Sequence, residues 1–119
     1  TLQLKKEYGK AIADLELAMK TNPDSYEAIN DLAWLLATAT EPSVRSGARS
    51  LELATQACNM TGNSQWNTLD TLAAAYAENG QWDKAKEWLM TAIANAPDKE
   101  KPRLQGHLDL VIGQMPIRQ

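Results

Sequence analysis

The chain has 119 residues, the length of a single domain, and its 44% hydrophobic and 23% charged residues are ordinary for a soluble globular or helical-repeat protein. A net charge of −3 without a basic patch argues against nucleic acid as the main partner. No apolar run approaches the ~18 residues of a membrane span, so we expect no membrane partner. Cys58 is the only cysteine, which excludes an intrachain disulfide; the cytoplasm is slightly favoured and the periplasm stays open.

Apolar residues recur at three- and four-residue steps along most of the chain, and this spacing predicts helices. Pro23 stops the first helix, because the residue before a proline avoids the helical region, and Ser25 is placed to cap the second. The segment 40–47 contains Pro, Ser and Gly and is expected to be a loop. The predicted helices cover about residues 8–22, 26–38, 48–60, 66–79, 82–95 and 102–113.

The predicted helices fall into repeats. Residues 8–23 and 82–97 align without a gap, with an aromatic residue, two alanines, a leucine and a proline at matching positions. Residues 30–39 and 70–79 also match, with a shift of 40 residues. A first and a second helix therefore alternate, and neighbouring pairs must stack because one pair cannot bury its apolar faces alone.

The stretch 70–97 carries nearly the whole signature of a tetratricopeptide repeat (TPR), and the chain resembles a fragment of a bacterial-type TPR protein. The resemblance implies an all-α fold of antiparallel helix-turn-helix repeats, stacked as a right-handed α-solenoid with the first helices on its concave side. The spacing of 40 residues departs from the family period of about 34, and Gly62 stands where the family has proline. The matching residues are Leu72, Ala73, Tyr76, Gly80, Trp82, Ala85, Leu89, Ala92 and Pro97.

We expect one domain over residues 1–119, and because it begins in mid-pattern we expect it to be part of a longer protein. The last helix keeps Leu104, Leu108 and Val111 of the pattern and is interpreted as a cap over the open end of the stack. The expected parts are a partial repeat (1–25), a repeat with a long internal loop at 40–47 (26–64), a full repeat (65–99), a capping helix (100–113) and a tail (114–119).

Two alanines mark where first and second helices are expected to cross most closely. At Ala33 and Ala73 a larger side chain would force the helices apart, at a cost of about 1–3 kcal/mol. Tyr76, Trp82 and Leu89 are expected to fill the gaps that remain.

The first helices are predicted to present a concave groove. The groove contains acidic residues and no basic ones, because residues 26–38 and 67–79 include no Lys or Arg. This charge favours a basic or neutral peptide as partner. The alternative is that these acids only solvate a surface. TPR modules that hold a peptide carboxylate use Lys and Arg there, so we expect no such role. The predicted groove residues are Glu27, Asn30, Trp34, Ala37, Thr38, Asn67, Asp70, Ala74, Ala77 and Glu78.

The aromatic residues leave alternatives open. Trp34 is either a contact residue in the groove or a packing residue, under the loop 40–47 or against a neighbouring helix. Trp66 is expected to be a packing residue, Trp82 a core residue, and Trp88 a half-exposed one on the convex side.

Reactive side chains are scarce. His107 and Cys58 are single and lie in different predicted helices, and no metal-ligand cluster or phosphate-binding loop is visible, so we expect no enzyme, no metal and no cofactor. The favoured function is a protein-protein interaction module that binds a peptide or partner segment. The alternative is a structural, self-associating segment of a larger scaffold. In this case copies of the chain would form a homo-oligomer through the apolar N-terminal edge at Leu2, Leu4 and Ile12. RNA binding is disfavoured by the acidic groove.

Overall fold

The computed structural model describes residues 2–119, and within them every regular element is a helix. The expected all-α class is therefore confirmed. Most adjacent helices are joined by short turns, α2 and α3 are joined by a longer loop, and a 3-10 turn, η1 (Asp98–Glu100), precedes the last helix. The helices are α1 (Leu2–Thr21), α2 (Tyr26–Thr38), α3 (Gly47–Met60), α4 (Trp66–Glu78), α5 (Trp82–Asn95) and α6 (Lys101–Ile112).

The predicted helix ends agree closely with the observed ones, except at the start of α1. That helix already begins at Leu2, because residues 2–7 contain only good helix formers. Ser25 is the N-cap residue of α2, but its hydroxyl donates to the Glu27 carboxylate at 3.2 Å and caps no backbone N–H. Gly80 ends α4 with a φ of 73°, a left-handed conformation that glycine adopts without steric cost.

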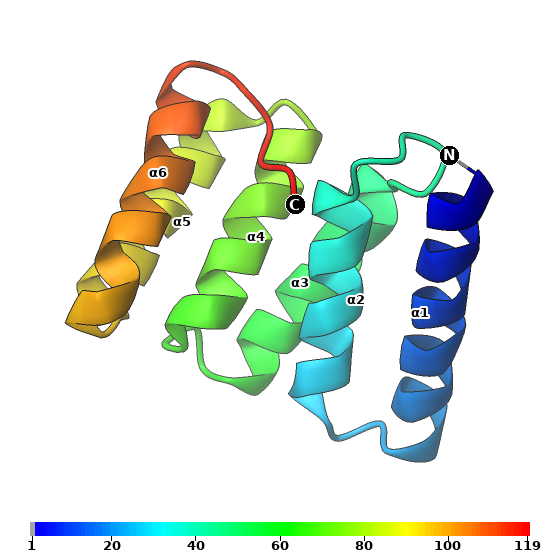
Figure 1. Cartoon of the computed structure of the whole chain (residues 1–119). Coiled ribbons are helices and arrows are strands. Elements are labelled where there is room, and N and C mark those ends of the chain that lie inside the picture. Colours follow the sequence, from blue (N-terminus) through cyan, green and yellow to red (C-terminus); the bar gives the residue numbers. More distant parts are fainter. Residues whose placement is uncertain (1) are drawn as a thin grey trace.

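The helices pack mainly with their neighbours in the chain. α2 packs on α3, α4 on α5 and α5 on α6, while α2 and α4 also lie against each other. In Figure 1, α2, α4 and α6 face the viewer and α3 and α5 lie behind them. Ala33 and Ala73 are fully buried, as expected for residues at close helix crossings.

The buried side chains form two apolar clusters. The first joins α2, α3 and α4 around Leu32, Leu53 and Leu69. The second contains alanines of α2, α4 and α5 together with larger side chains of α6 and the segment after it. Small residues on one side and large ones on the other allow α6 and this segment to approach closely. The second cluster consists of Ala37, Ala73, Ala74, Ala77, Ala85, Leu89, Leu108, Val111 and Ile117.

The loop between α2 and α3 is fixed by hydrogen bonds. The Ser46 N–H donates to the Leu36 carbonyl at 2.9 Å, and the Arg45 guanidinium donates to the Ala39 carbonyl at 2.7 Å. Because these bonds seat the loop on the end of α2, Arg45 Nε lies 3.4 Å from the Glu78 carboxylate on α4.

The segment after α6 folds back over α2 and α4, as the red end of the ribbon in Figure 1 shows. Ile117 is only 1% exposed, and the Gln119 N–H donates to the Thr38 carbonyl at 2.9 Å. The Tyr8 hydroxyl of α1 in turn donates to the Gln119 side chain at 3.3 Å. The residues expected to be a tail therefore belong to the packed body.

Candidate functional site

The predicted groove residues divide into a covered set and an open set, which lines a cleft although two of its members, Asn30 and Asp70, are largely buried. Thr38 is fully buried and Ala74 is 1% exposed, and Ala37 and Ala77 are buried as well. The expectation that these four residues line an open groove is wrong. The reason is tertiary: Leu108, Val111 and Ile117 complete one apolar cluster with the three alanines.

Glu78 also has a role that the sequence did not indicate. Its carboxylate accepts a hydrogen bond from Arg118 at 2.8 Å and lies 3.4 Å from Arg45. The Arg118 guanidinium also donates to the Ala37 carbonyl at 3.2 Å. Two guanidinium groups thus neutralise this acid, and it adds no free negative charge to the surface formed by α2 and α4.

The open set lines a cleft between α2, α4 and α6, with a volume of about 260 Å³. We call it the tryptophan cleft. Four predicted site residues meet there, namely Asn30, Trp34, Asn67 and Asp70, whereas Glu27 lies one turn outside it and is exposed. The cleft is lined by Asn30, Asp31, Trp34, Trp66, Asn67, Asp70, Thr71 and Arg103.

The geometry selects between the alternatives for Trp34. Its half-buried indole lines the tryptophan cleft, and the ring centroid lies 5.7 Å from that of His107 on α6, with the planes tilted by 39°. Trp34 therefore packs against a neighbouring helix and lines the cleft at the same time. The loop 40–47 is not needed to explain its position.

Asp70 is held in place by α6. It is 3% exposed, its Oδ1 lies 2.9 Å from His107 Nδ1, and its Oδ2 lies 3.9 Å from the Arg103 guanidinium. The same guanidinium lies over the Trp66 ring, 5.6 Å from its centroid. Sequence reasoning missed both partners of Asp70. The available signal was the spacing of Arg103 and His107. They lie one helical turn apart and next to the apolar residues of α6, so they lie on the face of α6 that packs against the rest of the chain.

Asn30 is the most unusual residue of the cleft. Its side chain belongs to a residue that is 8% exposed, and its Oδ1 is the one buried side-chain oxygen or nitrogen among residues 2–119 without a hydrogen-bond partner. A buried polar group left unpaired costs about 1–3 kcal/mol. No group in the described part of the chain donates a hydrogen bond to this acceptor.

Asp31 lies at the exposed rim of the tryptophan cleft. Partial burial raises the pKa of its carboxyl above the ordinary value of 3.8, and the neighbouring Glu27 carboxylate raises it further. The folded chain therefore holds this proton more tightly than the unfolded chain does. Above the pKa of Asp31 in the folded chain, its ionised carboxylate lowers the stability of the fold. This cost disappears at a pH where Asp31 is protonated in both the folded and the unfolded chain.

Asp31→Asn is therefore expected to raise the melting temperature slightly at neutral pH. The gain should shrink as the pH falls and vanish below the ordinary carboxyl pKa of 3.8. Melting curves of both proteins, followed by circular dichroism across this range, measure the difference. A gain that stays constant down to acidic pH would assign the effect to a property other than the charge.

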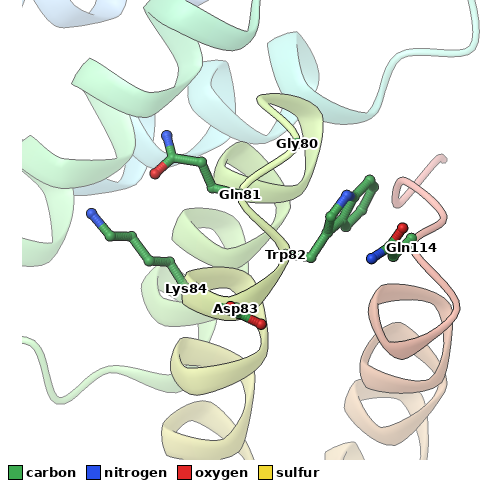
Figure 2. A pocket seen from close by; sticks show the side chains of 6 residues that line it. All are labelled: Gly80, Gln81, Trp82, Asp83, Lys84 and Gln114. Atoms are coloured by element: carbon green, nitrogen blue, oxygen red, sulfur yellow. The ribbon is translucent and has the colours of Figure 1, made fainter.

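A second hollow of about 360 Å³ lies at the start of α5, where the side chains of Trp82 and Gln114 approach each other (Figure 2). Trp82, expected in the core, is half-buried there. No buried polar atom without a partner lines this hollow among the described residues. The tryptophan cleft is therefore the better candidate. The hollow is lined by Gly80, Gln81, Trp82, Asp83, Lys84 and Gln114.

The other chemically reactive groups lie away from the cleft. Cys58 is 1% exposed, burial raises the pKa of its thiol, and the thiol donates to the Thr68 carbonyl at 3.3 Å. Such a thiol is a poor nucleophile. Within residues 2–119, no three His, Cys, Asp or Glu side chains are grouped as metal ligands, and no helix combines the length and apolar character of a membrane span.

Comparison with known proteins gave no match to a protein family, a curated protein or a solved structure. The fold and the cleft together define the chain as an all-α protein of neighbouring packed helices with one polar, aromatic cleft between α2, α4 and α6.

Proposed function

We propose that the chain is a protein-protein interaction module without catalytic activity, built as a TPR-like right-handed α-solenoid, and that it binds a segment of a partner protein in the tryptophan cleft. The repeat pattern over residues 70–97 and the buried crossing residues Ala33 and Ala73 support the TPR-like arrangement. Solenoids of this kind present concave surfaces on which partners bind.

The single observation that carries the proposal is the composition of the cleft. The cleft is lined by two indoles, those of Trp34 and Trp66. It also contains the buried Asn30 amide, whose oxygen is unpaired, and an exposed carboxylate, that of Asp31. Tryptophan is enriched among the residues that dominate protein-protein binding energy. A polar group that is buried and unpaired in the free protein can gain a partner from a bound chain.

The test is selection from a random-peptide library on the immobilised chain. We expect enrichment of a common sequence, and Asn67→Arg should weaken the selected peptides by about tenfold or more, because it adds a large charged side chain at the cleft. The matched control is Asn59→Arg, an exposed asparagine on α3, which should bind as wild type does. No enrichment, or equal binding by both variants, would refute the proposed site.

One observation favours self-association as the second candidate function. None of the described residues of α1 is fully buried, and Leu2 and Leu17 are 70% and 63% exposed. An exposed apolar face of this kind can pack against a second copy. Light scattering over a concentration series tests it: a dimer that Leu17→Lys converts to a monomer favours assembly, and a monomer at every concentration favours partner binding.

A further inference from the structure

Beyond its general suitability for a partner, the tryptophan cleft has a chemistry that selects one kind of side chain. Asn30 Oδ1 is an acceptor without a donor inside a residue that is 92% buried, since its exposed fraction is 8%. Two donors that line the cleft have other partners: the Thr71 hydroxyl donates to the backbone carbonyl of Asn67, and the Arg103 guanidinium contacts the Glu100 and Asp70 carboxylates. A ligand that brings an N–H or O–H donor into the cleft would satisfy Asn30 Oδ1.

The charge around the cleft specifies that this donor is positive. Neither Asp31 nor Glu27 forms an ion pair with a base among residues 2–119. Arg103, which lines the cleft, already contacts two carboxylates, Glu100 at 3.0 Å and Asp70 at 3.9 Å. Its charge is therefore balanced within the chain, and the rim of the cleft is left negative. A cation is attracted to this rim, and an anion is repelled.

The indole of Trp34 favours the same ligand. The face of a tryptophan ring attracts cations, as the neighbouring Trp66 illustrates by carrying the guanidinium of Arg103 at 5.6 Å from its centroid. Trp34 lines the cleft from α2. The volume of about 260 Å³ lies below the range of about 300–1,000 Å³ that is usual for whole small-molecule sites, which favours one inserted side chain.

We propose that the tryptophan cleft receives a single lysine or arginine side chain of the partner segment, which lies against Trp34 and donates a hydrogen bond to Asn30 Oδ1. This inference rests on the proposed function for the source of the side chain, and the cleft chemistry itself is testable without it. The Asn30 acceptor, the carboxylates without an ion-pair partner and the Trp34 indole each act on the same positive group.

The test uses the whole chain and four blocked tripeptides, acetyl-Gly-X-Gly-amide, in which X is lysine, arginine, norleucine or glutamate. Nuclear magnetic resonance follows the indole N–H signals of Trp34 and Trp66 during titration. We expect both basic peptides to shift these signals. Norleucine, which has the same alkyl chain without the charge, should bind at least about tenfold more weakly, and glutamate should not bind.

The variant Asn30→Leu removes the acceptor and keeps the branching and the number of heavy atoms of the side chain. We expect it to fold with equal or higher stability, since the unpaired oxygen is lost, and to bind the lysine peptide about tenfold more weakly. Asn59→Leu on α3 is the matched control and should bind as wild type does. Binding of norleucine equal to that of lysine, or unchanged binding by Asn30→Leu, would overturn the inference.

The two proposals fail in different ways. If the library selects peptides that bind at the cleft but contain no essential Lys or Arg, the interaction module stands and the cation site is wrong. If the basic tripeptides bind through Asn30 while the library yields no common sequence, the cation site stands and partner-segment binding is wrong.

Discussion

Ile117→Ala is expected to lower the free energy of unfolding by about 2–5 kcal/mol, the range for truncation of a large buried aliphatic side chain. Ile117 is 1% exposed and shares an apolar cluster with Ala37, Ala74 and Ala77. These alanines cannot move into the space that the truncation leaves, because they are short and fixed on two packed helices. The cavity should therefore remain open, and the melting temperature should fall by about 8 °C or more.

The control for this prediction is a second isoleucine. Ile112 lies at the end of α6 and is 60% exposed, so Ile112→Ala should change the stability by no more than about 0.5 kcal/mol. Urea unfolding followed by circular dichroism measures both variants. If the two substitutions had the same small effect, the segment after α6 would not be packed on α2 and α4 as described.

Ala73→Leu is expected to destabilise the chain by about 1–3 kcal/mol, because the added methylene groups have no space to enter. Ala73 has no exposed surface and belongs to the cluster that contains Ala85, Leu89 and Leu108. A leucine there must push α4 away from its neighbours or adopt an unfavourable rotamer. The effect should be a loss of stability even though leucine is a good helix former and is more apolar than alanine.

The matched substitution is Ala94→Leu on α5, where the alanine is exposed. Replacing alanine by leucine changes the helix propensity equally little at both positions. The free energy of unfolding of the Ala94→Leu variant should therefore stay within about 0.5 kcal/mol of wild type. Thermal and urea unfolding of the two variants separate the packing effect from the propensity effect. A stable Ala73→Leu protein would contradict the close helix packing on which the fold depends.

The fold of the C-terminal part also defines which surface is open to a partner. Ile117, Arg118 and Gln119 cover the later turns of α2 and α4. The earlier turns, with Asn30 and Trp66, stay open. The open cleft is therefore shorter than the groove predicted from the first helices alone, and it is less acidic because Glu78 has two guanidinium partners.

The candidate site was predictable only in part. The helical register placed Asn30, Trp34, Asn67 and Asp70 on one side of two neighbouring helices, and these residues do line one cleft. The same register could not reveal that Arg103 and His107 of α6 bind Asp70, since the last helix departs from the repeat pattern. It also could not show that one amide oxygen remains without a donor.

The sequence by itself determined the local structure of this protein. The three- and four-residue apolar spacing, Pro23 and Gly80 set the helices and their ends, and the alanines at the crossing positions set which faces pack. These signals are local because the formation and the termination of a helix depend on residues close in the sequence. The tertiary structure alone decided the pairing of Arg118 with Glu78, 40 residues away, and of His107 with Asp70, 37 residues away. These contacts depend on how α6 and the segment after it pack against α4, which no local pattern specifies.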